Sequence, residues 1–197
     1  MSRSLALRGF GAGLVLLCAL ATSCGSTVRV FVNPQADLAY YKKIAVLPFN
    51  DLGGSRDGAP RVTRAFVTEL IMSNRFELLQ PEDFTSTLYR MGIFRQQDGT
   101  FDADKLKAAA TQLGVTGILR GTVSEFQMTR VEGGDIPTVA FDAELIDVAT
   151  GNVVWRSSIT RRGKGRLPLL GGGTRSLAKL TQDACRQLVE QLKGKAI

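Results

Sequence analysis

The sequence of 197 residues contains no histidine. Histidine is the commonest general base, the commonest metal ligand and the usual partner of a serine or cysteine nucleophile. The sequence also has no Walker A motif and no grouping of a nucleophile, a base and oxyanion donors. These absences argue against catalysis, so the sequence predicts a protein that is not an enzyme and that holds no metal ion and no cofactor.

No hydrophobic run is long enough to cross a membrane as a helix. The longest, residues 9–20, has 12 residues, whereas a transmembrane helix needs about 20. It follows Arg3 and Arg8 and precedes the small residues 21–23. A basic start, a short apolar run and small residues at the cleavage point are typical of a secretory signal peptide. We therefore predict that residues 1–23 are removed on export.

Cysteine is scarce, and Cys24 directly follows the small residues of the signal. This arrangement resembles the lipobox of bacterial lipoproteins. The resemblance implies that cleavage occurs before Cys24, that its thiol carries a diacylglycerol and that its new amine carries an acyl chain such as palmitate. The alternative is a plain secretory signal with an incidental cysteine. Because Gly25 stands where inner-membrane retention would require aspartate, the resemblance implies the outer membrane.

After removal of residues 1–23 the exported chain keeps two cysteines, and Cys185 has no partner if Cys24 carries lipid, so the fold cannot depend on a disulfide. Cys185 falls in an amphipathic helix pattern, which is typical of a small buried residue rather than a nucleophile. We expect residues 24–39 to be a lipidated tether, with an edge strand at 28–32 as one option. Residues 40–197 are expected to form a single periplasmic domain.

The positive charge of the exported chain is confined to its last part. Residues 24–155 carry 13 basic and 16 acidic side chains, whereas residues 156–197 carry 10 basic and 2 acidic ones. A nucleic-acid-binding domain is more evenly basic, and an exported protein rarely meets nucleic acid, so we exclude that partner. A basic end suits an anionic membrane surface or an acidic protein partner. A solvated surface without a partner is the alternative.

Hydrophobic periodicity predicts nine elements in the order β-α-β-α-α-β-β-β-α. The predicted strands are residues 44–49, 76–79, 115–128, 139–145 and 153–159, and the predicted helices are 59–74, 81–92, one beginning at Asp102 or Asp104, and 174–193. This order indicates an α/β (α+β) fold with a single mixed sheet packed with helices. Gly117 and Gly121 indicate a close backbone approach or a bulge in the third strand. Residues 131–137 are expected to form a turn.

Two acidic residues share one face of the predicted strand 139–145. Asp142 and Glu144 alternate there with apolar neighbours. Paired carboxylates can serve acid–base catalysis. On an exposed strand face, however, two acids are ordinarily solvated, and no catalytic role is expected for them.

Four segments of the chain together resemble the CsgG-like group of envelope lipoproteins. They are residues 43–51, 69–79, 113–123 and 145–155. The group includes the curli secretion channel and the lipoprotein activators of penicillin-binding proteins, and the N-terminal domain of TolB is a more distant relative in fold. The resemblance implies an anticodon-binding-like domain on a lipid anchor that works through protein–protein contacts.

The resemblance and the residues lead to one function and one alternative. We expect an outer-membrane-anchored periplasmic lipoprotein that assembles or regulates an envelope or secretion machine without catalysis. The alternative is a subunit of a curli-type oligomeric channel, which implies assembly with copies of itself. Each subunit of such a channel needs two membrane-spanning hairpins, on the order of 40 extra residues, and loops 92–100 and 161–173 are too short to supply them.

The basic, glycine-rich loop at 161–173 is the candidate working surface. Its arginines and lysine would face anionic headgroups while its leucines enter the membrane, or the loop would bind a protein partner. The candidate contact residues are Arg161, Arg162, Lys164, Arg166, Leu167, Leu169 and Leu170.

Overall fold

The computed structural model describes residues 26–97, 99–131, 134–163 and 176–193. In this part of the chain, seven strands form one mixed sheet in the order β1-β7-β6-β5-β2-β4, with β3 paired to β5 outside this path. The strands are β1 (Ser26–Val32), β2 (Lys43–Val46), β3 (Asn50–Asp51), β4 (Glu77–Leu79), β5 (Gly117–Val131), β6 (Gly134–Asp147) and β7 (Val153–Arg162). The helices are α2 (Gly58–Met72), α3 (Pro81–Arg90), α4 (Ala103–Gln112), α5 (Leu177–Leu192) and the short 3-10 helix η2 (Leu38–Tyr40).

The predicted fold class is confirmed. The succession β2, α2, β4, α3, α4, β5, β6, β7, α5 is the predicted β-α-β-α-α-β-β-β-α order, and all of the strands belong to one mixed sheet. The helix starts also follow the expected local signals. Asp102 caps α4, because its side chain accepts a hydrogen bond from the backbone N–H of Lys105 at 3.0 Å.

The segment expected as a tether contains a strand of the sheet. The whole of β1 pairs antiparallel with β7, from Ser26 opposite Arg161 to Val32 opposite Trp155. The edge-strand option therefore describes this segment, and only Gly25 separates Ser26 from Cys24 in the sequence.

The turn expected at residues 131–137 is shorter in the structure. Strands β5 and β6 continue pairing to Val131 opposite Gly134, and Pro137 lies opposite Met128 within the ladder. Pro137 lies just beyond the last β6–β7 pair, Thr138 with Arg162, where its carbonyl oxygen accepts a hydrogen bond from the N–H of Gly163 at 2.7 Å. Proline is tolerated at such a ladder end, because its missing N–H costs at most one terminal hydrogen bond.

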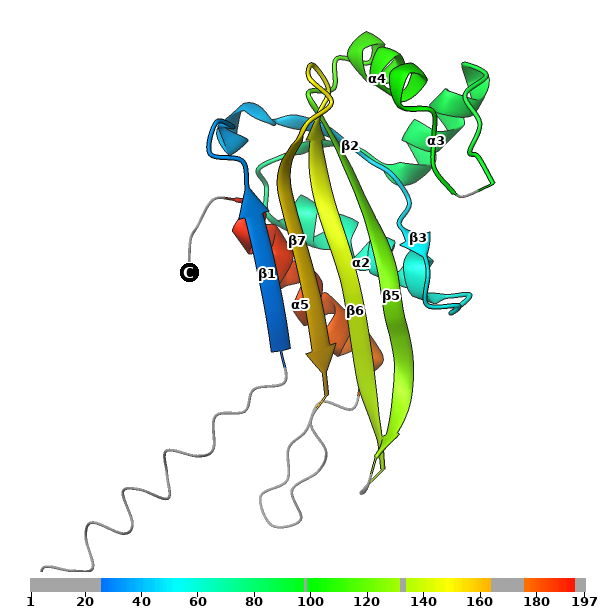
Figure 1. Ribbon diagram of the computed structural model, residues 1–197, viewed down its shortest axis with the longest axis vertical. Coiled ribbons are helices and arrows are strands. Elements are labelled where there is room, and N and C mark those ends of the chain that lie inside the picture. The colour runs from blue at the N-terminus through cyan, green and yellow to red at the C-terminus, as the bar shows by residue number, and fades with distance from the viewer. Residues whose placement is uncertain (1–25, 98, 132–133, 164–175, 194–197) are drawn as a thin grey trace, which may run out of the picture.

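Helices α2 and α5 lie side by side on one face of the sheet (Figure 1). Phe66 of α2 and Phe141 of β6 are buried against each other, with ring centroids 6.4 Å apart in an edge-to-face arrangement. Trp155 of β7 is fully buried in the same core. Helices α3 and α4 build a second, smaller core on the opposite face, around Phe84 and Leu88. The sheet therefore has one face covered along its length and one face covered only at one end.

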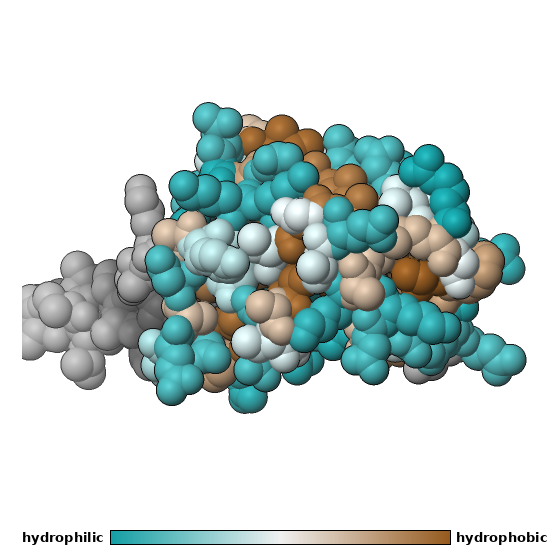
Figure 2. All heavy atoms as spheres, turned by 90° about the horizontal axis from the view of Figure 1, so that it is seen from above, coloured by the Kyte–Doolittle hydropathy of each residue, from teal (hydrophilic) through white to brown (hydrophobic). Residues whose placement is uncertain are grey.

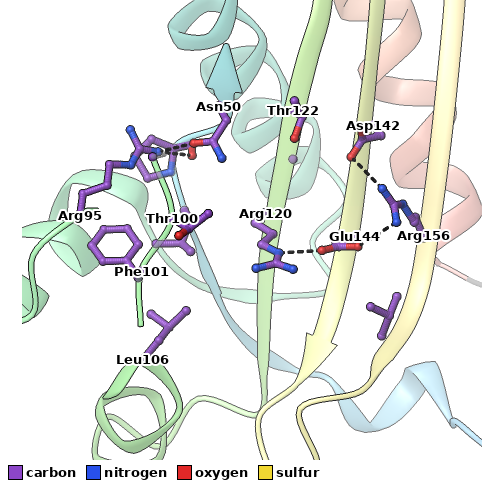
Figure 3. A pocket seen from close by; sticks show the side chains of 15 residues that line it. Asn50, Arg95, Thr100, Phe101, Leu106, Arg120, Thr122, Asp142, Glu144 and Arg156 are labelled. Atoms are coloured by element: carbon purple, nitrogen blue, oxygen red, sulfur yellow. Dashed lines mark hydrogen bonds and ion pairs between the residues drawn. The ribbon is translucent and has the colours of Figure 1, made fainter. Parts of the chain in front are cut away.

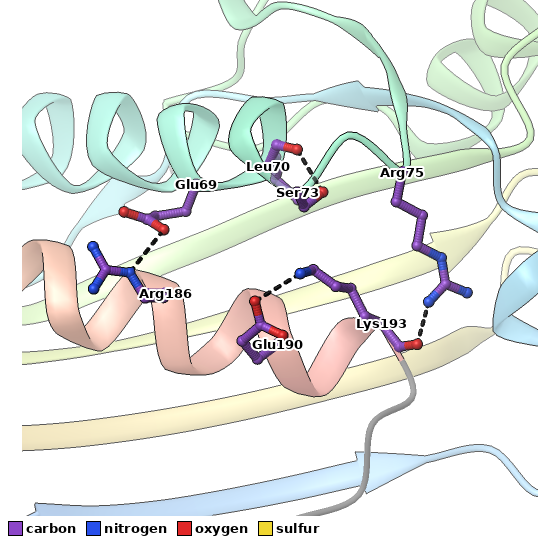
Figure 4. Close-up of polar contacts among 7 residues, drawn as sticks. All are labelled: Glu69, Leu70, Ser73, Arg75, Arg186, Glu190 and Lys193. Atoms are coloured by element: carbon purple, nitrogen blue, oxygen red, sulfur yellow. Dashed lines mark hydrogen bonds and ion pairs between the residues drawn. The ribbon is translucent and has the colours of Figure 1, made fainter.

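Polar contacts join the two long helices (Figure 4). Glu69 of α2 is buried, and its Oε2 accepts a hydrogen bond from Nε of Arg186 of α5 at 3.3 Å. At the ends of the helices, the guanidinium of Arg75 donates to the backbone carbonyl of Lys193. Cys185 of α5 is fully buried, as its helix pattern predicts, and burial raises the pKa of its thiol. Among the described residues, no helix is both long and apolar enough to span a membrane.

Gly121 marks a close approach between β5 and its neighbours. A Cβ atom at this position would lie 2.5 Å from the carbonyl oxygen of Asp142 and 2.6 Å from the ring of Phe49. The prediction of a close backbone approach is therefore confirmed for Gly121. The bulge of β5 lies elsewhere, between Val123 and Glu125.

We expect Gly121→Ala to lower the free energy of unfolding by about 2–3 kcal/mol, because the clash involves backbone and a buried ring that cannot move independently. Gly54→Ala is the control, since its Cβ would meet nothing within 4 Å and only the positive φ of 70° would cost about 1 kcal/mol. Urea unfolding of both variants measures the difference. Equal losses for the two variants would contradict the tight packing at Gly121.

Candidate functional site

The face of the sheet opposite α2 and α5 carries the candidate site. Side chains alternate between the two faces of a strand, so burial of Phe141 and Leu145 against the helices places Asp142 and Glu144 on the other face. We call the part of this face formed by Arg120, Asp142, Glu144 and Arg156 the ionic face. It comes from three neighbouring strands, β5, β6 and β7.

The ionic face is organised around Glu144. This residue lies directly opposite Arg120 of β5 on one side and directly opposite Arg156 of β7 on the other. Its Oε1 accepts a hydrogen bond from Nε of Arg120 at 2.6 Å, and its Oε2 lies 3.7 Å from Nη1 of Arg156. The Glu144 side chain is only 10% exposed, whereas those of Arg120 and Arg156 are about half exposed. One buried carboxylate thus fixes two partly exposed guanidinium groups on a rigid sheet.

Asp142 is the second acid of the ionic face. Its Oδ1 lies 3.8 Å from Nη2 of Arg156. Burial raises the pKa of Asp142 above its ordinary value of 3.8, Arg156 opposes this effect, and the negative charge of Glu144 adds to it. The sequence-based expectation that both acids are simply solvated is therefore wrong. Arginines on the neighbouring strands pair with them, and Glu144 is buried.

A cavity of about 440 Å³ lies over the ionic face (Figure 3). Its opposite wall comes from the loop after α3, where Nη2 of Arg95 donates to Oδ1 of Asn50 at 2.8 Å and to the carbonyl oxygen of Pro48 at 3.2 Å. The Arg95 guanidinium also lies 6.0 Å from the ring centroid of Phe101. Three arginines and two carboxylates therefore line one cavity, which leaves an excess of positive charge.

The geometry suits binding rather than acid–base catalysis. Both carboxylates of the ionic face lie within 4 Å of arginine nitrogens, so each is engaged in an ion pair rather than directed at open space in the cavity. Among the described residues, no group of three or more acidic or cysteine side chains is placed to hold a metal ion. Half-exposed guanidinium groups held in place by a buried acid are well suited to bind carboxylates or other anions of a partner.

Exposed aromatic residues stand near the same end of the molecule. Tyr89 and Phe94 stack with their ring centroids 5.7 Å apart, and Phe94 is 66% exposed. Figure 2, which views this end from above, shows small hydrophobic patches separated by hydrophilic atoms. Aromatic and arginine side chains in combination are typical of protein-binding surfaces.

Two of the sequence-predicted contact residues, Arg161 and Arg162, are described by the structure and do not line this cavity. Arg161 and Arg162 are the last residues of β7 rather than part of a loop, and Nη2 of Arg161 donates to Oε1 of Gln187 of α5 at 3.0 Å. The other predicted contact residues and the predicted acylation site lie outside the described residues; these are Cys24, Lys164, Arg166, Leu167, Leu169 and Leu170.

Sequence analysis missed Arg95, Arg120 and Arg156. Each strand next to β6 carries an arginine, Arg120 on β5 and Arg156 on β7, whose side chain points to the same face as Asp142 and Glu144. These two arginines were the signal in the sequence. That signal becomes specific only when the strand register is known, because a shift of one residue moves every side chain to the other face.

Comparison with known proteins gives a family match. The family model described as the peptidoglycan-synthase activator LpoB matches residues 59–159, which is just over half of the chain. The matched range begins in α2, ends in β7 and includes all four residues of the ionic face. No curated protein matches the chain by sequence at a significant level.

Two solved structures share the fold at low sequence identity, and a third aligns less closely. PelC from Paraburkholderia phytofirmans, a dodecamer, aligns with a TM-score of 0.60 and 20% identity over 85% of this chain and 96% of that chain. Lipoprotein GNA1162 from Neisseria meningitidis aligns with a TM-score of 0.54 and 18% identity over 78% and 99%. The C-terminal domain of LpoB from Escherichia coli aligns with a TM-score of 0.46 and 19% identity over 61% and 82%.

We expect the two acids of the ionic face to respond differently to neutralisation. Glu144→Gln removes the buried charge that holds two arginines and is expected to lower the free energy of unfolding at pH 7 by about 1–2 kcal/mol. Asp142→Asn is expected to cost less, because the folded state already disfavours its ionised form.

The pH dependence of the free energy of unfolding separates the contribution of Asp142 from that of Glu144. The pKa of Asp142 is higher in the folded state than its ordinary value of 3.8. Its protonated form therefore stabilises the fold fully below pH 3.8, and this stabilisation is lost as the pH rises through the folded pKa. Asp142→Asn should therefore flatten the stability profile in that window. Urea unfolding from pH 3.5 to 8 measures it, and an unchanged profile would contradict the assignment.

Proposed function

Because the chain belongs to the family of the peptidoglycan-synthase activator LpoB, we propose that it is a non-enzymatic envelope lipoprotein that activates a peptidoglycan synthase by direct contact. The observation that carries this proposal is the family match, which covers β4, β5, β6, most of β7 and all four residues of the ionic face. In this proposal the protein is anchored in the outer membrane and faces the periplasm. It supplies a binding surface, and the synthase supplies the chemistry.

The ionic face is the proposed contact surface for the synthase. Arg120 and Arg156 are held in fixed positions by Glu144, so little side-chain entropy is lost when they bind an anionic partner. Arg95 adds a third positive charge from the opposite wall of the cavity. The partner surface that fits this arrangement carries carboxylates, which guanidinium groups bind in a bidentate manner.

The anchor is proposed at Cys24. Gly25 alone would separate the acylated residue from the start of β1, and two residues span at most about 7 Å. Ser26 lies opposite Arg161, so the basic end of β7 would lie close to the headgroups. The loop residues proposed to touch the membrane or the partner follow directly from that end. The proposed range of the anchored domain accordingly begins at Ser26 rather than at residue 40.

Self-assembly is a second element of the proposal, and it is supported by the dodecameric state of PelC. A curli-type channel, the alternative function, gains no support from the matched family, which is named for synthase activation. We therefore retain the accessory role and propose copies of the same chain as one of its partners.

A reconstituted synthase assay tests the contact surface. Full-length protein in mild detergent is added to a purified peptidoglycan synthase of the same bacterium, and the rate of glycan polymerisation is measured against protein concentration. We expect stimulation by the natural protein. The double variant Arg120→Glu/Arg156→Glu should weaken the apparent affinity about tenfold or more, because it places like charges opposite the partner's acids.

The matched control is the double variant Arg61→Glu/Arg64→Glu, which makes the same change of net charge at two exposed positions of α2. Stimulation should survive this change. Loss of stimulation in both variants would indicate a general charge effect, and the absence of stimulation by the natural protein would contradict the proposed function. Circular dichroism of each variant verifies that the fold is retained.

Substitution of Cys24 tests the anchor. Cys24→Ala should abolish incorporation of radiolabelled palmitate and move the protein from the outer-membrane fraction to the soluble periplasmic fraction. Cys185→Ala serves as the control, because the buried thiol of Cys185 is not a substrate for acylation. Continued labelling of the Cys24→Ala variant would refute the lipobox assignment.

A further inference from the structure

Strand β1 leaves one long edge of the sheet without a partner among the described residues. It pairs with β7 along all seven of its residues and is the first strand in the sheet order. The opposite edge is formed by β4, which has only three residues. An edge strand exposes backbone N–H and C=O groups that can pair with another strand.

The ladder determines which backbone groups of β1 point outward. The N–H of Asn33 donates to the carbonyl oxygen of Val154 at 2.9 Å, so this directly opposed pair is hydrogen-bonded. Hydrogen-bonded pairs alternate with non-bonded pairs in an antiparallel ladder. The N–H and C=O groups of Val28, Val30 and Val32 therefore point away from β7.

The side chains of the same edge are unusually apolar for a surface. Val30, Phe31 and Val32 are 46%, 51% and 42% exposed. Natural edge strands are ordinarily protected by proline, bulges or several charges. Strand β1 contains no proline, pairs with β7 in a continuous register and carries one charged residue, Arg29.

We propose that this edge binds β1 of a second copy of the chain, antiparallel and symmetric about Val30. In that register Val30 lies opposite the second copy's Val30, and Val28 lies opposite the second copy's Val32. All of the outward N–H and C=O groups of the three valines are then paired. On the other face of the strand, Arg29 lies opposite the second copy's Phe31, which allows a cation–π contact. The proposal deepens the self-assembly part of the proposed function by naming its surface.

The two neighbouring symmetric registers are less favourable. Symmetry about Arg29 would place two arginines directly opposite each other, and like charges in that position are destabilising. Symmetry about Phe31 would place Val28 opposite Pro34, which has no N–H to donate. The sequence of β1 is thus complementary to itself in one register, which is why a second copy is the proposed occupant.

Disulfide crosslinking of the full-length protein in membranes tests the register. Val30→Cys should form a disulfide-linked dimer on mild oxidation, because directly opposed residues of a hydrogen-bonded pair have Cα atoms about 5.5 Å apart. Thr27→Cys is the control on the same strand. It lies opposite the second copy's Asn33, about 20 Å along the strand from the second copy's Thr27, so it should not crosslink. The unsubstituted protein reports any crosslink through its own cysteines.

Light scattering in mild detergent supplies a second measurement. Val30→Lys places two like charges at the symmetry axis and should halve the mass of the assembly or reduce it further. Leu52→Lys is the matched control, since Leu52 is 78% exposed and lies beyond β3, away from β1. The control should keep the mass of the natural protein.

The outcomes distinguish this inference from the broader proposal. A monomeric natural protein would overturn both self-assembly and the β1 contact. An oligomer that neither crosslinks at Val30→Cys nor changes mass with Val30→Lys would leave self-assembly standing and overturn the β1 contact. Crosslinking of Val30→Cys to a different protein would assign the edge to that protein's strand and overturn pairing with a second copy.

Discussion

Burial of one face of the sheet against α2 and α5 is the constraint on which the rest of the structure depends. Phe141 and its alternate neighbours on β6 must point toward the helices, where Phe66 and Trp155 complete the core. The strand repeat of two residues then places Asp142 and Glu144 on the opposite face. Because the neighbouring strands pair in fixed register, Arg120 and Arg156 face Glu144 from both sides. The ionic face is therefore a consequence of core packing.

The partial cover of this second face gives the site its shape. Helices α3 and α4 cover only one end of the face, and the loop between them brings Arg95 and Phe101 to the edge of the cavity. A fully covered face would bury the arginines at a high desolvation cost, and a fully open face would leave Glu144 exposed to water. The intermediate arrangement keeps one acid buried and three guanidinium groups accessible, which suits recognition of a partner and fits a family of synthase activators.

Strand β1 takes part in both the proposed anchoring and the proposed assembly. Strand β1 begins two residues after the predicted acylation site, so a lipid at Cys24 would hold the sheet close to the membrane. The same strand carries the apolar edge that has no partner strand within the described part of the chain. An anchor restricts molecules to a surface and raises their effective concentration, which favours weak contacts between copies. Anchoring and edge pairing would then reinforce each other.

The sequence by itself determined the order of elements, the class of fold and the buried stripes, because hydrophobic periodicity, helix caps and turn glycines act within a few residues. It also indicated the special packing of Gly121 and the burial of Cys185. Only the tertiary structure decided that Asp142 and Glu144 are paired with arginines rather than solvated, that Arg161 belongs to β7, and that β1 leaves Val28, Val30 and Val32 with outward backbone groups. These features depend on which strands are neighbours and in which register they pair, and that register brings together residues that are distant in sequence, such as Arg120 and Glu144 or Val32 and Trp155.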